Sequence, residues 1–284
     1  MNMAVTTQGW EALLKLRFAE RGDKTRIVAR ERRGPLAVQR SFYPEGPVCH
    51  TYLLHPPGGV VGGDSLDIQV RVEEGACALV TTPGATKFYR SGGRLATQQQ
   101  TLSVAAGGLL EWLPQENIFF PDAYARVESH IALEPGARFI GWDIQCLGRP
   151  VIGEGFDCGQ VDCATHLGIG GELVLVDRLR TQGRSLIDAA AGMRGLPMLA
   201  TMLLVPGAAT AEQMKILLET TREAIAGADC KTLEVGATQV DGVIAVRVLG
   251  QRTEAILRLF TAIWRRLRPM IAGLEATPPR IWST

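Results

Sequence analysis

The chain has 284 residues, and its hydrophobic content of 46% is ordinary for a globular protein with a substantial core. Its 30 Lys and Arg nearly balance its 29 Asp and Glu, so there is no global positive field of the kind that attracts nucleic acid. No apolar run reaches the roughly 18 residues that a membrane-spanning helix requires.

The N-terminal stretch and the cysteines predict a location. Residues 1–15 contain no apolar segment typical of a secretory signal. The six cysteines are spread too thinly along the chain for a disulfide framework. We therefore expect a cytoplasmic protein.

The first predicted strands lead into a glycine-rich loop. Short strands are expected over 25–32 and 36–43, joined through Arg33-Gly34-Pro35, and a third is expected over 48–55. The sequence LHPPGGVVGGD follows at 54–64. Glycine allows close backbone approach and proline restricts φ, so this segment is a shaped loop. It either connects two strands tightly or presents backbone groups and a carboxylate at a defined place. It lacks the Lys-Ser/Thr ending of a phosphate-binding loop.

Two histidines flank this loop on its N-terminal side. His50 and His55 are five positions apart, so they face opposite sides of a regular strand. His55 borders the loop and is the better site candidate, whereas His50 is interpreted as structural.

A turn pattern recurs after the alternating strand expected over 64–72. Each copy has an aliphatic residue, two others, a glycine, a small residue and then an apolar end. The glycines are Gly75, Gly107, Gly136 and Gly170, separated by 32, 29 and 34 positions. A period near 30 with a strand on each side predicts stacked β layers, as in a β-solenoid. The alternative is that glycine-centred hairpin turns look alike in any β protein.

Two stretches between these turns combine aromatic and charged residues. The stretch 81–91 carries Lys87 and Arg90 beside two aromatics, and 111–122 carries three carboxylates among Trp112 and two phenylalanines. Such segments form either a binding surface or a core with a charged rim. Prolines at 114 and 121 argue against a central strand in the second stretch.

A carboxylate interrupts the apolar strand expected over 139–147. Asp143 follows Trp142, and burying it without a partner would cost several kcal/mol. It must face solvent, pair with a residue such as Arg149, or line a wet cavity.

Further along, Asp157, Cys158, Cys163 and His166 could form a metal cluster, but their spacing fits no standard zinc pattern. Individual cysteines are the favoured interpretation.

The C-terminal part changes character. After a strand over 172–180 that contains Asp177, Thr210 begins a capping box for a helix, and strands are expected over 231–235 and 243–249. Thr253 is expected to cap a last helix that Pro269 ends or kinks. The basic residues Arg265, Arg266 and Arg268 are expected in its last turn.

We therefore expect a single domain over 1–284, mainly β, with a stacked solenoid-like architecture and two α-helices near the C-terminus. Its β-rich part covers about 10–195 and its α/β part about 196–284.

Several long motifs together resemble one family. They are the loop at 54–64, PGATKFYRS at 83–91, WLPQENIFFP at 112–121, CLGRPVIGE at 146–154 and PRIW at 279–282. They resemble the urease accessory protein UreD family, also called UreH, from about Trp10 to the end. The resemblance implies a mainly β nickel-insertion scaffold that is not an enzyme. It implies binding to UreF, which recruits the nickel-carrying GTPase UreG, contact with apo-urease subunits, and a possible homodimer within the accessory complex.

The resemblance also implies that Ni²⁺ passes through an internal water-filled tunnel, with no permanently bound cofactor. Nickel would need weakly binding oxygen ligands in series, because strong ligands would retain it. Asp143 is the first candidate for such a lining residue. The further candidates are Asp64, Asp177, Glu111 and His55. For each residue the alternative role is an ion pair or a turn cap. UreF is expected on exposed apolar surface of the C-terminal helices and of 112–122.

An enzyme remains the rival class. No GxSxG or HExxH motif is present, so serine hydrolase and zincin chemistry are unsupported. A β-solenoid carbohydrate-active hydrolase would need two carboxylates converging on a cleft. The residues that could supply such a pair are Asp64, Glu111, Glu116, Asp122 and Asp143.

Overall fold

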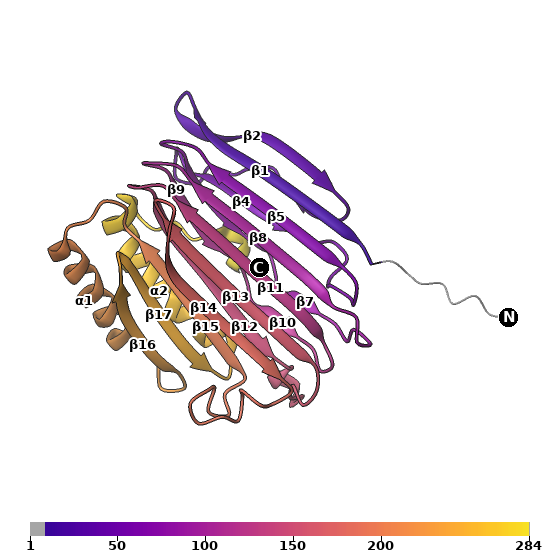
Figure 1. Ribbon diagram of the computed structural model, residues 1–284. Coiled ribbons are helices and arrows are strands. Elements are labelled where there is room, and N and C mark those ends of the chain that lie inside the picture. Colours follow the sequence, from indigo (N-terminus) through magenta and orange to yellow (C-terminus); the bar gives the residue numbers. More distant parts are fainter. Residues whose placement is uncertain (1–8, 284) are drawn as a thin grey trace.

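The computed structural model describes residues 9–283, which form two facing β-sheets with helices on one side (Figure 1). The first sheet has the strand order β14-β13-β11-β8-β5-β1-β2. Its strands are β1 (Glu11–Arg21), β2 (Lys24–Arg33), β5 (Ser65–Val72), β8 (Ala96–Val104), β11 (Tyr124–Leu133), β13 (Gln160–Ile169) and β14 (Glu172–Gln182). We call it sheet A.

The second sheet, sheet C, has the order β16-β17-β15-β12-β9-β6-β4-β3, and two short strands extend it, one paired with β12 and the other paired with that short strand. Its main strands are β3 (Ala37–Val38), β4 (Cys49–Leu54), β6 (Cys77–Thr81), β9 (Leu109–Leu113), β12 (Arg138–Leu147), β15 (Met198–Val205), β16 (Glu234–Val240) and β17 (Val243–Gly250). The short strands are β7 (Thr86–Phe88) and β10 (Asn117–Phe119).

The middle of the chain winds between the two sheets as stacked coils. Strand β5 lies in sheet A, β6 in sheet C and β7 on a short third side, and β8, β9 and β10 repeat that course one layer on. Parallel pairing places Thr97 beside Ser65 and Arg126 beside Thr97. The predicted solenoid-like stacking is thus confirmed.

Three of the four predicted glycine turns are the corners of these coils. Gly75, Gly107 and Gly136 have φ of +69°, +67° and +82°, a conformation that favours glycine. The Gly107 amide donates to the Gly136 carbonyl at 3.3 Å, so successive corners stack. Gly170 differs, because it turns β13 into its antiparallel neighbour β14 within sheet A. The fourth copy is therefore a hairpin, the alternative that the pattern left open.

Alternating side chains divide the protein into two cores. On β5, Leu66, Ile68, Val70 and Val72 point between the sheets and are buried. A second apolar cluster lies between the outer side of sheet C and the helices, and includes Ile140, Trp142 and Ile144 of β12. Both faces of β12 are therefore covered, and a polar residue on this strand must be satisfied inside the protein.

The helices are α1 (Ala211–Gly227) and α2 (Thr253–Ala272), and they pack on sheet C and on each other. The capping box predicted at Thr210 is confirmed, since its hydroxyl accepts from the Gln213 amide and the Gln213 side chain accepts from the Thr210 amide. The predicted Thr253 cap is wrong, because Thr253 lies inside α2 and its hydroxyl contacts the Met198 sulfur. Pro269 does not end α2, which closes instead at Gly273 in a left-handed conformation.

The strand predictions near the N-terminus need correction. Strand β1 was not predicted, and β2 pairs with it rather than with the following segment. The strand expected over 36–43 is reduced to the two residues of β3. The strand expected over 231–235 begins only at Glu234. Prolines 114 and 121 lie outside β9 and β10, but the expectation of no central strand over 111–122 is wrong for 111–113, which belong to β9 between β12 and β6.

The glycine-rich loop is shaped by contact with the neighbouring loop after β7. A Cβ on Gly62 would lie 2.4 Å from the Ser91 carbonyl oxygen, and a Cβ on Gly59 would lie 2.2 Å from the Tyr89 ring. The glycines therefore allow two chain segments to touch. This supports the interpretation of the segment as a tight connection.

We expect Gly62→Ala to lower the free energy of unfolding by about 1–3 kcal/mol, because the added methyl group meets backbone that cannot turn aside. Gly84→Ala is the matched control, since a Cβ there meets nothing within 4 Å. Urea unfolding followed by tryptophan fluorescence measures both variants. Equal stability of the two would show that the loop does not need glycine at position 62.

Candidate functional site

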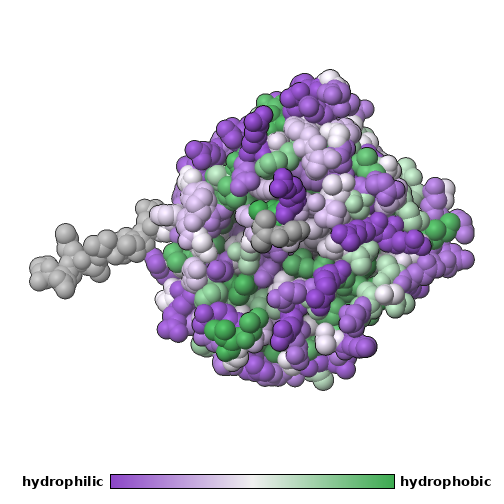
Figure 2. Space-filling view, turned by 180° about the vertical axis from the view of Figure 1, so that it is seen from behind, coloured by the Kyte–Doolittle hydropathy of each residue, from purple (hydrophilic) through white to green (hydrophobic). Residues whose placement is uncertain are grey.

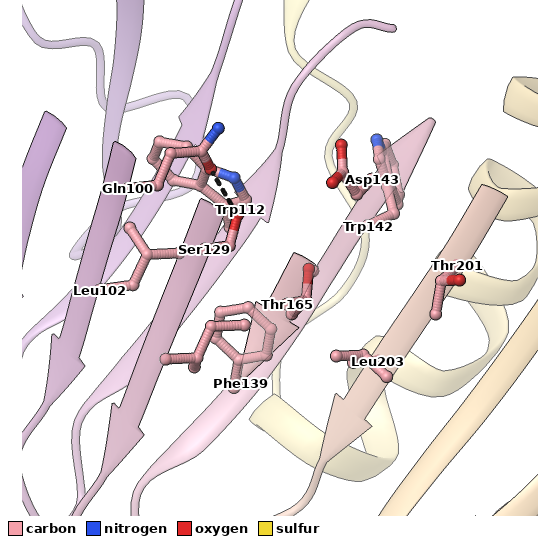
Figure 3. A pocket seen from close by; sticks show the side chains of 12 residues that line it. Gln100, Leu102, Trp112, Ser129, Phe139, Trp142, Asp143, Thr165, Thr201 and Leu203 are labelled. Carbon is pink, nitrogen blue, oxygen red and sulfur yellow. Dashed lines mark hydrogen bonds between the residues drawn. The ribbon is translucent and has the colours of Figure 1, made fainter. Parts of the chain in front are cut away.

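Asp143 borders a small cavity between the two sheets (Figure 3). The cavity has a volume of about 30 Å³, enough for one or two water molecules. Its polar lining residues are Gln100, Ser129, Asp143, Thr165 and Thr201, and its apolar lining includes Trp112, Phe139 and Leu203. A second cavity of about 30 Å³ shares Asp143, Thr165 and Thr201 with the first and extends to Asp177. Polar side chains thus border two neighbouring small cavities between the sheets.

The alternation of β12 explains how Asp143 reaches this space. The side chains of Phe139 and Asp143 point between the sheets, and Gly141 lies on the same face of β12. Trp142 points the other way, toward α2, where it packs against Phe260. Gly141 keeps the space open, since a Cβ there would lie 2.4 Å from the Phe139 ring. Because Gly141 has no side chain, there is room beside the Asp143 carboxylate.

The environment of Asp143 perturbs its acidity. Burial raises its pKa from 3.8 to about 6, the nearby charge of Asp177 adds to the rise, and a hydrogen bond with Gln145 opposes it. The Asn117 side-chain amide donates to the carboxylate at 3.3 Å. Asp143 is therefore mostly ionised at neutral pH, but at a free-energy cost that a cation would relieve.

Asp177 lies at the edge where the two sheets meet. Its carboxylate accepts from the Thr201 hydroxyl at 2.6 Å and forms an ion pair with Arg247 of β17. Because Asp177 belongs to sheet A and its partners to sheet C, these contacts join the sheets beside the second cavity. The structure brings Asp143 and Asp177, two of the predicted site residues, to one polar space.

The other two residues from the glycine-rich loop lie elsewhere. Asp64 accepts from the backbone amides of Trp10 at 2.8 Å and Val61 at 3.0 Å, so both carboxylate oxygens hold the loop. His55 is half-buried and lines a different cavity of about 160 Å³ together with residues 82–87. Burial lowers the pKa of His55, and the charge of Asp64 opposes this shift. In this structure Asp64 has the geometry of a turn cap.

Glu111 faces away from the cavity, toward α2. It accepts from Arg268 Nη2 at 2.8 Å and from the Trp264 indole at 2.6 Å. The same guanidinium binds Glu45, whose Oε1 lies 2.5 Å from His50 Nε2. Glu111 and Arg268 are completely buried. Glu111 is thus a partner in an ion pair, the alternative left open for it.

This buried cluster is the largest feature that the sequence did not predict. The prediction that Arg268 lies in the last turn is wrong, because α2 continues to Ala272, and Arg268 is buried in the protein interior. Burial alone would lower the pKa of Arg268, but hydrogen bonds to Glu111 and Glu45 raise it overall. Burial likewise would raise the pKa of Glu45, but hydrogen bonds from His50 and Arg268 lower it overall. Arg268 follows the core residue Trp264 by four positions, which was the available signal.

The possible metal cluster around Cys158 does not form. Cys158 is exposed on a loop, Cys163 points between the sheets, and His166 points to the outer face of sheet A. Odd and even positions on β13 face opposite sides, so this separation follows from strand geometry. Within residues 9–283 no three His, Cys, Asp or Glu side chains are arranged to hold a metal ion.

The carboxylates of the rival hydrolase are not arranged as a catalytic pair. Asp64 is bound to the backbone amides of Trp10 and Val61, and Glu111 is bound to Arg268. Asp122 is partly exposed and forms an ion pair with Arg90 at 3.8 Å. Burial raises the pKa of Glu116, whose side chain bonds Thr253 beside α2. The space beside Asp143, about 30 Å³, is too small for a sugar ring. None of these groups faces a cleft of substrate size.

The expected apolar docking surface at 112–122 is also absent. Trp112, Leu113 and Phe119 are buried, so this stretch contributes to the core. The exposed side of α2 carries Arg265, Arg266 and Met270 instead. Figure 2 shows hydrophobic side chains interspersed among hydrophilic ones on the rear face. No helix in the described part of the chain is both long and apolar enough to cross a membrane.

Comparison with known proteins gives a consistent result over the whole chain. The family model described as UreD urease accessory protein matches residues 11–283. A protein from Vibrio parahaemolyticus named urease accessory protein UreD is 46% identical over 283 residues, covering 100% of this chain and 99% of the relative. Relatives of the same name from Escherichia coli and Pseudomonas putida strain GB-1 are each 45% identical over 97% of this chain, which corresponds to 98% and 95% of those proteins.

Proposed function

This chain belongs to the UreD family of urease accessory proteins and acts in urease maturation, and from that premise we propose that it conveys Ni²⁺ toward the urease active site. In this proposal the protein docks on apo-urease and carries no resident cofactor. Ni²⁺ is its cargo. The observation that carries the proposal is the small cavity between the sheets that Asp143, Gln100, Ser129, Thr165 and Thr201 help to line, with the pKa of Asp143 raised to about 6.

The physical chemistry of nickel favours such a path. Moving a divalent ion into an apolar interior is prohibitively costly, so the ion must exchange its waters for protein oxygens. Carboxylate, hydroxyl and amide oxygens bind Ni²⁺ more weakly than imidazole or thiolate, which allows release. The two small cavities beside Asp143 and Asp177 offer these oxygen ligands and share Asp143, Thr165 and Thr201 in their linings. A series of weak sites satisfies the condition that each step be reversible.

We assign the central part of the route to Asp143 and Asp177. Asp177 is held in an ion pair with Arg247, so a nickel ion that binds this carboxylate must displace Arg247. Asp64 and His55 stay secondary candidates near the glycine-rich loop, because the Asp64 oxygens are already satisfied. Glu111 is the weakest of the five, since it is buried on the other face of sheet C.

We propose UreF as the direct partner, with the GTPase UreG joining through UreF, and a homodimer of such units in the complete complex. The exposed face of α2, with Arg265, Arg266 and Met270, is the proposed UreF contact. Two cationic side chains beside an exposed apolar one are suited to a mixed protein interface.

The direct test is urease activation in cells that lack this chain, with the nickel content of purified urease measured by atomic spectroscopy. We expect apo-urease without the chain and nickel-loaded urease when it is restored. Full nickel loading in its absence would reject the proposal. A carbohydrate hydrolase would instead turn over a glycan when incubated alone, an outcome that we do not expect.

A further inference from the structure

Two of the four histidines of the chain lie side by side on the outer face of sheet A. His130 on β11 and His166 on β13 are direct partners in the parallel register. Their imidazole rings are stacked, with centroids 5.1 Å apart and planes inclined by 12°. Figure 1 shows the two strands adjacent in the sheet. The pair therefore lies on two hydrogen-bonded strands in the interior of sheet A.

Neither ring is engaged by another side chain. In the part of the chain that the structure describes, neither His130 nor His166 has a hydrogen bond or an ion pair, unlike His50, which contacts Glu45. Both are half-buried, so their rings are held by neighbours and still reach solvent. Their neighbours in the same row across the sheet are Thr101 on β8 and Val176 on β14, neither of which carries a charge. The ring nitrogens are thus available to a ligand from solvent.

We propose that His130 and His166 form a surface site for one divalent transition-metal ion of the kind that favours imidazole, such as Ni²⁺ or Zn²⁺. An imidazole nitrogen binds these metals at about 2.0–2.1 Å, so two nitrogens sharing an ion lie roughly 3–4 Å apart. Rings with centroids 5.1 Å apart reach that separation by turning about their Cβ–Cγ bonds, without movement of the strands. Water completes the coordination.

This site is separate from the internal cavity. The side chains on either side of His130, Ser129 and Ile131, point between the sheets and line that cavity, whereas His130 points away from it. With two protein ligands and no carboxylate in the same row, the site should exchange its metal readily. It differs from the rejected Cys158 and Cys163 cluster, because it needs only side chains that already lie together.

The test is titration of the purified protein with Ni²⁺ alone, followed by calorimetry and equilibrium dialysis. We expect one exchangeable ion on this face, and affinity lower by about a hundredfold in His130→Ala or His166→Ala, since either change removes the chelate. Asp143→Asn should retain this ion, and Thr101→Ala is the matched control on the neighbouring strand. Thermal unfolding establishes that each variant is folded.

A second readout identifies the ligands directly. Zn²⁺, which is diamagnetic, should shift the ring resonances of both His130 and His166 in an NMR spectrum, and should leave those of His50 unchanged. Unchanged Ni²⁺ stoichiometry and affinity in a variant that carries both His130→Ala and His166→Ala would overturn the proposal. Loss of the ion in Asp143→Asn but not in the histidine variants would assign it to the cavity and also overturn the surface site.

Discussion

Replacing Arg268 with alanine is expected to destabilise the protein by about 3–5 kcal/mol, because the change leaves buried Glu111 and Glu45 without their cationic partner. The guanidinium makes hydrogen bonds to both carboxylates and also donates to the Glu275 carbonyl. A lysine has one charged nitrogen in place of the planar fork, so Arg268→Lys should recover only part of the loss. Denaturant unfolding measures the series.

The matched control is Arg266→Ala, which removes an exposed arginine from the same helix and should change stability by no more than about 0.5 kcal/mol. Removing the orphaned charge offers a second check. Glu111→Gln should be destabilising in the native chain but should partly rescue Arg268→Met, because the cost comes from an unpaired carboxylate. Equal stability of Arg268→Ala and Arg266→Ala would show that the buried cluster does not hold α2.

The pH dependence of this cluster has a defined sign. The pKa of Glu45 is lowered below its ordinary value of 4.5 in the folded protein, so the native state holds fewer protons than the unfolded state there. The resulting stabilisation is present above pH 4.5 and is lost as the pH falls through the lowered pKa. The penalty of Arg268→Ala should therefore shrink in acid. A penalty that is constant with pH would contradict the ion-pair account.

The buried cluster around Arg268 also shows what could not be predicted from the sequence. Alternation in β5, the capping box at Thr210 and the regular glycine turns are local patterns, and each was visible without the structure. Contacts between Arg268 and Glu45 join positions 223 apart in the chain, and no local pattern encodes them. Arg268 was expected to complement the helix dipole in the last turn, although its spacing of four positions from Trp264 placed it on the buried side of α2.

Some features of the candidate site were visible in the sequence and others were not. Asp143 was identifiable because a carboxylate in an apolar strand requires a special environment, and the structure places it beside a small cavity with several polar side chains in its lining. The proximity of Asp143 to Asp177 depends on the order of the strands in the two sheets, which could not be predicted from the sequence. The paired positions of His130 and His166 depend on register, and a period of uneven length left the register open.

Asp143→Asn is expected to lower the nickel content of urease several-fold while leaving the accessory complex assembled, because an amide is a poorer nickel ligand than a carboxylate. The experiment expresses the variant in cells that lack the native chain and measures metal per urease active site. Asp122→Asn is the matched control, since it changes an exposed carboxylate outside the cavity. Fully loaded urease with Asp143→Asn would show that this residue does not line the path.

Stability separates loss of transfer from loss of folding. The pKa of Asp143 is raised from 3.8 to about 6 in the folded protein, so the native state holds more protons than the unfolded state between these values. Native stability therefore falls as the pH rises through this window, and the full cost applies above about pH 6. Asparagine does not ionise, so it avoids the free-energy cost of a buried charge. Asp143→Asn should therefore be more stable than the native chain by about 1–3 kcal/mol at pH 8, and its stability should differ little at pH 3.5. A variant that gains stability and assembles the accessory complex, yet fails to deliver nickel, is explained by loss of the ligand. A loss of stability at pH 8 would mean instead that the carboxylate stabilises the fold.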